Sequence, residues 1–330
     1  MSGEMRAVTL TGTGGPEVMQ VSTLPIPRPG PGQVLIAVQA AGVNRPDISQ
    51  RQGRYPVPAD ASPIPGLEVA GTIAALGDGV EGFIPEQPVC ALVHGGGYAT
   101  HALADAGTTL PLPAPLSMIE AAALPEVALT VEFNVVQRAG LQAGDWVLIH
   151  GGSSGIGSHA VERARALGAR VIVTAGSDQK CGYCTGLGAE AAINYKTTDF
   201  VQAVRDVTGG HGADVVLDMV GGPYVTRNLQ ALADDGRYAV ISLQGGREIT
   251  ADFEPLLRRR LSIIGSTLRP LPPARKAALA RDVVRDVWPL IAAGKIRPQI
   301  YQSFPLDRVA DAHRLMESGA HQGKIVLTMG

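Results

Sequence analysis

The sequence has few cysteines, no marked excess of either charge and no long apolar run. Three cysteines among 330 residues cannot build a disulfide framework, so a reducing compartment is expected. The 28 basic and 30 acidic residues leave a net charge of −2, which gives no electrostatic basis for binding nucleic acid or an anionic membrane. No apolar run reaches the ~18 residues that a membrane helix needs, and the first residues lack the apolar stretch of a secretory signal. We therefore expect a cytoplasmic protein without nucleic-acid or membrane partners.

Aromatic residues are also scarce, at 4%, so the core must consist mainly of Val, Ile, Leu and Ala. The chain is too long for one ordinary core and predicts about two domains. Its 41 glycines and 24 prolines follow no fixed period, which indicates many turns between short elements.

The first part of the chain, up to about residue 125, has the pattern of short strands and turns. A proline-rich stretch at 25–31 is typical of an extended loop between two of the strands. The pattern predicts a partly open barrel of irregular strands. The expected strands are 5–10, 33–41, 69–76 and 88–93.

Beyond Pro115 the pattern changes to alternating helices and strands. Ser117 and Glu120 form a capping-box pattern that predicts a helix start, and a second helix is expected over 127–139. Nearly continuous apolar strands then alternate with helices, which predicts a doubly wound parallel sheet of the α/β class. The expected strands are 146–150, 170–174, 214–218, 238–243 and 261–267, and an amphipathic helix is expected at 156–167. The last part should form a helix over 274–293, a strand at 299–304, a helix at 307–318 and a strand at 323–328.

A glycine-rich turn, Gly152-Ser153-Ser154-Gly155-Ile156-Gly157, joins a predicted strand to a predicted helix. Small residues at such a turn let the backbone approach a pyrophosphate closely. The N-terminus of the helix adds unpaired N–H groups and a partial positive charge. The spacing is GxxGxG, and its position between a strand and a helix predicts a dinucleotide site; a tight structural turn is the alternative.

The end of the next strand indicates which dinucleotide binds. NAD enzymes usually place an acid there, about 20 residues after the glycines, to bind the ribose 2′-hydroxyl. This chain has Gly176 and Ser177, which leave room for a 2′-phosphate, and Lys180 follows as a possible counter-charge. We therefore expect NADPH, provided that the carboxylate of Asp178 points away from the phosphate.

Several further segments resemble the zinc-free quinone oxidoreductases of the zeta-crystallin type, within the medium-chain dehydrogenase/reductase superfamily. The resemblance covers essentially the whole chain and is more specific than the glycine turn alone. The matching segments, besides that turn, are 41–47 (AGVNRPD), 50–55 (QRQGRY), 66–71 (GLEVAG), 194–196 (NYK) and 323–326 (GKIV).

This resemblance implies a GroES-like, partly open β-barrel catalytic domain at 1–126, a Rossmann NADPH-binding domain at 127–268 and a C-terminal return to the catalytic domain at 269–330. It also implies a cleft between the domains for NADPH and the acceptor. Family members usually pair as homodimers through the edge of the Rossmann sheet, for which 261–268 is the candidate strand.

The resemblance argues against a zinc site. Zinc alcohol dehydrogenases of the superfamily carry Cys near position 44 and His near position 67, where this chain has Asn44 and Leu67. Neither residue is a ligand for catalytic zinc. Cys181 and Cys184 form an isolated CxxC, which is half of a zinc site at most, and we expect it to be structural.

The family's site residues transfer to positions of this chain that match its motifs. Asn44 and Tyr55 are expected to line the acceptor pocket beside the nicotinamide, and Asn44 also to contact the cofactor. Tyr55 could donate a hydrogen bond to a developing oxyanion. The other expected cofactor contacts are Thr130, Leu243, Gln244, Leu268 and Arg269 at the nicotinamide, Gly152, Ser153, Ser154, Gly155 and Ile156 at the pyrophosphate, Gly176, Ser177, Lys180 and Tyr195 at the 2′-phosphate and ribose, and Lys324 over the phosphates or ribose.

The resemblance thus implies NADPH-dependent reduction of quinones or similar electron-poor carbonyl acceptors, by hydride transfer without zinc. A reductase of enone or enoyl double bonds shares the fold and is the first alternative. A non-enzymatic, crystallin-like binding protein is the second. Glu132 departs from the family pattern near Thr130 and has no role at this level; neither the physiological acceptor nor the choice between one- and two-electron reduction follows from the residues.

Overall fold

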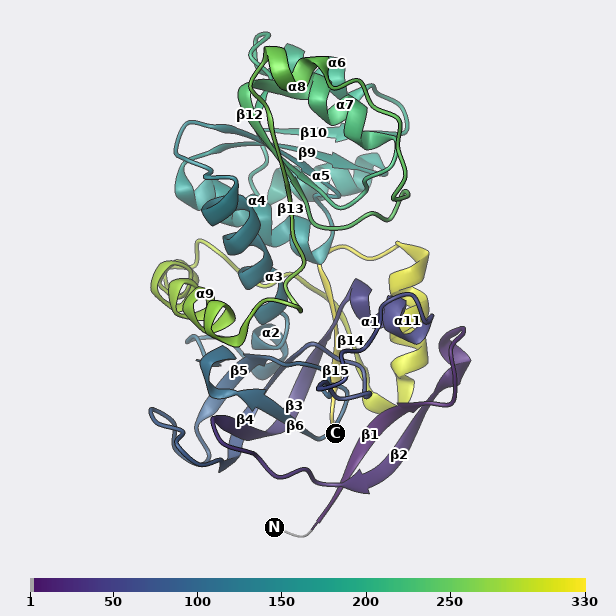
Figure 1. Ribbon diagram of the computed structural model, residues 1–330, viewed down its shortest axis with the longest axis vertical. Coiled ribbons are helices and arrows are strands. Elements are labelled where there is room, and N and C mark those ends of the chain that lie inside the picture. The colour runs from purple at the N-terminus through teal and green to yellow at the C-terminus, as the bar shows by residue number, and fades with distance from the viewer. Residues whose placement is uncertain (1–2) are drawn as a thin grey trace. The chain divides into compact units, whose positions relative to one another are not determined.

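The computed structural model describes residues 3–330, and the chain divides into two units (Figure 1). The first unit comprises Met1–Ala128, Leu271–Ala292 and Pro298–Gly330. The second comprises Leu129–Pro270 and Ala293–Arg297. Each unit has its own sheets and its own core, and each is described by itself below.

The first unit is built on a mixed sheet with the strand order β14-β15-β3-β4-β5-β7, in which β6 also pairs with β3. The long strand β3 pairs antiparallel with β15, β4 and β6, while β1 and β2 form a separate antiparallel hairpin. The strands are β1 Glu4–Leu10, β2 Met19–Pro25, β3 Gln33–Val43, β4 Glu68–Leu76, β5 Pro88–Leu92, β6 His101–Asp105, β7 Thr109–Pro111, β14 Ile300–Pro305 and β15 Lys324–Thr328. The helices are α1 Arg45–Arg51, α2 Met118–Ala121, α9 Pro273–Asp286, α10 Trp288–Ala292 and α11 Val309–Ser318.

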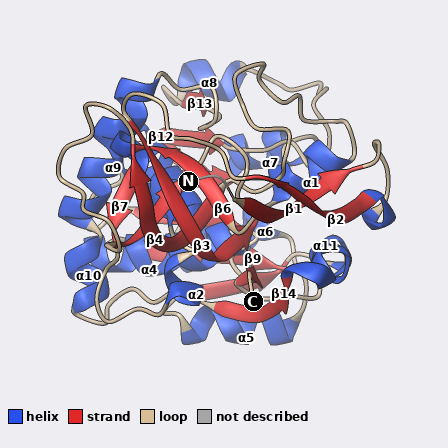
Figure 2. Cartoon of the chain, turned by 90° about the horizontal axis from the view of Figure 1, so that it is seen from below, coloured by secondary structure: helices blue, strands red, loops and turns tan. Residues whose placement is uncertain are grey.

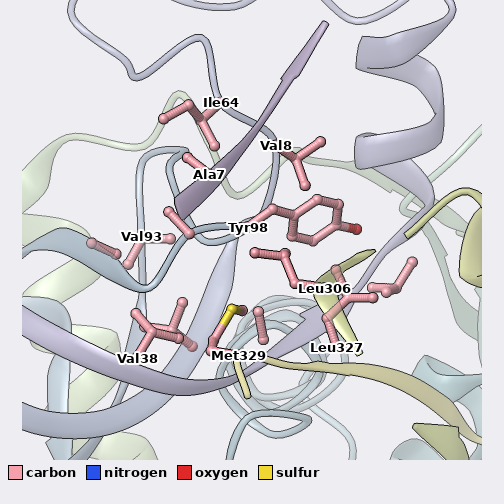
Figure 3. Packing of buried hydrophobic residues seen from close by; sticks show 14 of the residues in the cluster. Ala7, Val8, Val38, Ile64, Val93, Tyr98, Leu306, Leu327 and Met329 are labelled. Carbon is pink, nitrogen blue, oxygen red and sulfur yellow. The ribbon is translucent and has the colours of Figure 1, made fainter. Parts of the chain in front are cut away.

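The core of the first unit joins the two ends of the chain. Figure 3 shows Val8 of β1 and Val38 of β3 packed with Tyr98, Leu306 and Leu327. α11 packs beside β14 (Figure 2) and also contacts β15, because its apolar residues recur at helical spacing on one face. The partly open, strand-rich unit expected for the N-terminal part is confirmed.

The second unit holds a six-stranded, wholly parallel sheet in the order β10-β9-β8-β11-β12-β13. Numbered along this unit, that is the order 3-2-1-4-5-6 of a doubly wound dinucleotide-binding sheet. The strands are β8 Trp146–His150, β9 Arg170–Ala175, β10 Ala191–Asn194, β11 Ala213–Asp218, β12 Leu232–Val240 and β13 Ser262–Gly265, and the helices are α4 Gly155–Leu167, α5 Asp178–Gly186, α6 Phe200–Val207, α7 Tyr224–Ala231 and α8 Glu254–Arg258.

Alternate residues of β8 face opposite cores. Val147 and Ile149 pack in a cluster with residues of α4, whereas Trp146 and Leu148 pack in a second cluster with residues of α6 and α7. Both faces of the sheet are therefore covered, which explains why its strands are continuous apolar runs. The α/β fold class with a Rossmann-type sheet is confirmed.

Two expected helices differ from the structure. The single helix expected over 274–293 is wrong, because α9 ends at Asp286 and α10 begins at Trp288. Pro289 lacks the N–H that would continue the ladder across this point. The helix expected at 127–139 is α3, Pro125–Val131, followed by a π-helical turn at Glu132–Arg138.

Some shorter elements escaped the sequence pattern. Each of these unexpected elements has fewer than eight residues and little periodicity; they are β2, β6, β7, β10 and α1. Across residues 3–330, no helix is both long and apolar enough to cross a membrane.

Candidate active-site residues on the two units

The glycine turn follows β8, the first strand of the parallel sheet, where the strand order changes direction. Ser154 caps α4, since its hydroxyl accepts a hydrogen bond from the N–H of Gly157 at 3.0 Å. A Cβ on Gly157 would lie 2.2 Å from the carbonyl oxygen of Gly151, and a Cβ on Gly152 would lie 2.6 Å from the side-chain Cβ of Val173. Both positions therefore require glycine. This turn has the close packing and the open helix N-terminus that a pyrophosphate site needs.

Four residues expected at the 2′-phosphate and ribose gather at the ends of β9 and β10. Ser177 caps α5 and accepts a hydrogen bond from the N–H of Lys180 at 3.3 Å. The ring of Tyr195 covers Gly176 so closely that a Cβ there would lie 2.8 Å from the Tyr195 hydroxyl. The structure thus brings these residues to the carboxyl end of the sheet, where such folds bind nucleotides.

Asp178 is tied to the neighbouring strand. Its Oδ1 accepts a hydrogen bond of 2.8 Å from the side-chain amide of Asn194. The Oδ1 of Asn194 in turn accepts from the N–H of Lys196 at 3.2 Å. Partial burial and the like charge of Lys196 lower the pKa of Lys180, so two cations lie near each other at this site. Sequence reasoning assigned no role to Asn194 or Lys196, although both stand in the 194–196 segment that carried the resemblance.

The loops after β11 and β12 are joined to each other. Asp218, at the end of β11, accepts hydrogen bonds from the N–H of Val220 at 2.6 Å and from the hydroxyl of Tyr238 at 2.5 Å. The carbonyl of Val220 accepts from the N–H of Gly245 at 2.6 Å. The loop 243–246 is thereby anchored to a buried carboxylate that the sequence did not single out.

Leu243 and Gln244 lie in this loop and not in a strand. The strand expected at 238–243 begins earlier and ends at Val240. Leu243 is 48% exposed, whereas Leu268 and Arg269, which follow β13, are both buried.

Thr130 lies on α3 just before the π-helical turn and is buried. Its carbonyl accepts a hydrogen bond of 2.9 Å from the side-chain amide of Asn134. Glu132, which had no expected role, forms a buried ion pair with Arg163 of α4, with contacts of 3.0 and 3.3 Å. This pair ties α3 and its continuation to the helix that begins at the glycine turn.

Asn44 lies between the long strand β3 and α1, as the N-cap of that helix, and it is buried. Its amide nitrogen donates to Glu68 at 2.8 Å, and its amide oxygen accepts from Lys324 at 2.6 Å. The ammonium of Lys324 also contacts Glu68 at 2.5 Å and the carbonyl of Val43 at 3.4 Å. These protein acceptors match its three hydrogens, and the contact of Lys324 with the cofactor phosphates or ribose that the resemblance implied stays a prediction. Tyr55 lies in the loop after α1 and is half-buried.

Asp47, one turn into α1, lies in a second buried group beside Asn44. Its carboxylate accepts from the N–H of Asn44 at 2.8 Å, from the Tyr98 hydroxyl at 3.0 Å and from the N–H of Gly66 at 3.1 Å. The Tyr98 hydroxyl lies 3.2 Å from Nε2 of His313. Burial nevertheless outweighs these bonds and raises the pKa of Asp47 from 3.8 to about 6.

This raised pKa predicts a pH-dependent loss of stability. The contribution of Asp47 is fully present below pH ~4 and is lost as the pH rises to about 6, because the carboxyl of the unfolded chain ionises while the buried one is still protonated. The shift corresponds to about 3 kcal/mol. We expect Asp47→Asn to flatten the fall in unfolding free energy between pH 4.5 and 7, measured by urea denaturation. Parallel pH profiles for the two proteins would contradict the assignment.

The isolated CxxC fits a structural role. Cys181 and Cys184 are free thiols on α5, and Cys184 is buried in the core. Burial raises the pKa of Cys184 to about 12 and also raises that of Cys181. Both thiols are therefore poor sources of the thiolate that a metal or redox site needs.

A parallel sheet in this order, with a close glycine turn on its first strand, defines a dinucleotide-binding α/β protein. Residues 30–114 match the family described as alcohol dehydrogenase GroES-like domain, and residues 187–327 match zinc-binding dehydrogenase. The chain is 33% identical over 328 residues to a quinone oxidoreductase of Rattus norvegicus, with 98% of each chain covered.

Solved structures of other oxidoreductases are similar to this chain over almost its whole length. The Escherichia coli quinone oxidoreductase in complex with NADPH has a TM-score of 0.87 at 28% identity, with 98% of this chain and 99% of that chain covered. The CurK enoyl reductase has a TM-score of 0.85 at 26% identity, with 99% of each covered. The chain belongs to the medium-chain dehydrogenase/reductase superfamily and is similar to its quinone oxidoreductases; it is an oxidoreductase.

Proposed function

We propose that this oxidoreductase uses NADPH to reduce quinones or similar electron-poor carbonyl acceptors, without zinc. The observation that carries the cofactor choice is the end of β9, where Ser177 and Lys180 stand in place of an acid. Asp178 is hydrogen bonded to Asn194 at 2.8 Å, and Lys196 adds a second cation near Lys180. A 2′-phosphate would find positive charge here, and hydrogen bonds to charged groups are worth about 1.5–3 kcal/mol.

The residues at the glycine turn would hold the pyrophosphate. Gly152 and Gly157 leave no room for a Cβ, and the start of α4 offers backbone N–H groups to a dianion. Ser153, Ser154, Gly155 and Ile156 would contact the phosphates, while Thr130, Leu243, Gln244, Leu268 and Arg269 would flank the nicotinamide. NADPH supplies the hydride, so the protein contributes binding and orientation.

Asn44 and Tyr55 would line the acceptor pocket. A quinone is already electrophilic, which removes the need for a metal Lewis acid. Positions 44 and 67 carry Asn and Leu, neither of which is a zinc ligand. The Tyr55 hydroxyl would donate a hydrogen bond to the oxygen on which negative charge develops.

Reduction of an activated carbon–carbon double bond is the second candidate. It is supported by the similarity to the CurK enoyl reductase. A coenzyme A thioester would favour a basic entrance, and the basic run at 258–260 is the obvious source. Those arginines instead pair with acids: Arg258 with Glu254, Arg259 with Asp234 and Arg260 with Asp235. This pairing favours a small acceptor over a coenzyme A thioester.

A homodimer through the edge of the parallel sheet is also proposed. β13 is the last strand on one side of that sheet, and its Ile263 is 41% exposed. Phe253 and Leu257, in the segment that leads into β13, are 51% and 79% exposed. An unpaired strand edge beside apolar side chains suits pairing with a second copy.

The test is NADPH oxidation followed at 340 nm with matched panels of quinones and enones. We expect turnover with quinones to exceed turnover with enones. Reduction of an enone double bond requires protonation of a carbon atom, whereas reduction of a quinone does not. The same assay on Tyr55→Phe should lower kcat/KM for quinones about tenfold or more, as loss of an oxyanion donor does. Preference for enones would favour the second candidate, and an unchanged kcat/KM would remove Tyr55 from the mechanism.

A further inference from the structure

Three polar side chains form a buried cluster where β15, β3 and β4 lie side by side. Glu68 is 0%, Lys324 5% and Asn44 7% exposed. Each contacts the other two, at 2.5 Å for Lys324–Glu68, 2.6 Å for Lys324–Asn44 and 2.8 Å for Asn44–Glu68. We call this group the Asn44 cluster.

The two charged partners determine how the amide of Asn44 is oriented. An ammonium can only donate hydrogen bonds, and a carboxylate can only accept them. The amide oxygen must therefore face Lys324, and the NH₂ group must face Glu68. A flipped amide would set donor against donor and acceptor against acceptor, so one orientation is strongly favoured. One N–H of the amide remains beyond these two contacts.

Glu68 is itself held from two further directions. Its Oε2 accepts a hydrogen bond of 2.9 Å from the N–H of Glu126, at the start of α3. Its Oε1 lies against Gly42 of β3, where a Cβ would come within 2.1 Å of it. The carboxylate therefore has little freedom, and it links Asn44 to the start of α3.

Stability alone is a poor reason for such a cluster. Two charges lose their hydration on burial, and well-packed apolar residues of similar size often stabilise a core as well or better. The cluster does provide a fixed amide at the end of β3. A group held in one geometry before the reaction is what positioning in an active site requires.

We propose that Glu68 and Lys324 are positioning residues that fix the side-chain amide of Asn44 for the acceptor. The proposal rests on the proposed function, which places Asn44 in the acceptor pocket. Lys324 would act through Asn44 and not by contact with the cofactor phosphates. Loss of the pair should therefore lower kcat for quinone reduction while the affinity for NADPH stays the same.

The experiment compares Glu68→Gln, Lys324→Met and the double variant in the full-length protein with NADPH. Each single variant should be unstable, because it leaves one buried charge without its partner, and the double variant should recover most of the wild-type thermal stability. We expect the double variant to keep a kcat at least about tenfold below wild type, with an unchanged Kd for NADPH by fluorescence titration. Lys324→Arg, which keeps the charge, should retain most of the wild-type kcat.

Asn44→Ala provides the coupling measurement. It should lower kcat in the wild-type background and have little further effect in the Glu68→Gln/Lys324→Met background, since neighbours that act together are not additive. The matched control is Arg51→Met/Glu317→Gln, which removes another ion pair of the same unit, at 2.6 Å with a fully buried arginine. That control should leave kcat unchanged.

Recovery of both stability and kcat in the double variant would overturn the proposal, as would full additivity with Asn44→Ala. If the wild-type protein reduces no acceptor in either panel, the proposed function fails. The positioning role is then decided by the crystal structure of the double variant. An Asn44 amide that keeps its orientation without the two charges would rule the role out.

Discussion

Replacing Lys180 with alanine should weaken NADPH binding about 10- to 100-fold and leave NADH binding nearly unchanged. The range follows from about 1.5–3 kcal/mol for a hydrogen bond to a charged group. Only NADPH carries the 2′-phosphate that the ammonium would meet. Lys180 stands at the start of α5 beside the Ser177 cap, and the like charge of Lys196 lowers its pKa. Two neighbouring cations repel each other until an anion lies between them, so a bound dianion should relieve that repulsion.

The measurement is the Kd of each cofactor for wild type and Lys180→Ala, obtained by nicotinamide fluorescence at fixed ionic strength. Lys295→Ala is the matched control, because Lys295 is an exposed lysine of the same unit outside this site. It should change neither Kd. An equal loss of affinity for NADPH and NADH would show that Lys180 supports the fold of the site and does not bind the 2′-phosphate.

Arg163→Met should lower the free energy of unfolding by about 3–5 kcal/mol, the usual effect of removing one partner of a buried ion pair. The carboxylate of Glu132 is buried and would lose a two-point contact with the guanidinium. The pair also joins the π-helical turn after α3 to α4, so its loss removes a link between two packed helices. Urea denaturation monitored by tryptophan fluorescence would measure the change.

The double variant Glu132→Gln/Arg163→Met separates the ion pair from the packing. Without a buried charge it should recover more than half of the lost stability. Surface pairs provide the scale for comparison: Arg258–Glu254 is largely exposed, and its removal should change stability by less than about 1 kcal/mol. A loss of that small size for Arg163→Met would mean that Glu132 remains well solvated in the folded state.

Features that depend on neighbouring residues in the chain were predictable. The capping box at Ser117 and Glu120 forms as expected, with a hydrogen bond of 3.3 Å from the N–H of Glu120. β8 has the predicted bounds, because an apolar run between turn residues needs no distant information. The glycine turn is equally local, since its spacing and its place between a strand and a helix are both visible in a dozen residues.

Features that depend on which strands pair were not predictable. Lys324 and Glu68 are 256 residues apart in the chain, and their contact exists only because β15 and β4 both pair with β3. The interaction of Asn194 with Asp178 likewise required β10 to lie next to β9. A period of apolar residues shows that a strand has a buried face but does not identify its neighbour in the sheet.

The residues themselves thus determined the α/β class, the dinucleotide turn and the choice of Gly176, Ser177 and Lys180 at the end of β9. Tertiary structure alone decided the surroundings of those groups: where the carboxylate of Asp178 is held, which acid neutralises Lys324, and why Glu132 is buried. The physical reason is that backbone conformation and burial pattern are encoded within a few turns of chain. Hydrogen bonds and ion pairs between buried side chains arise only once distant segments have been brought together.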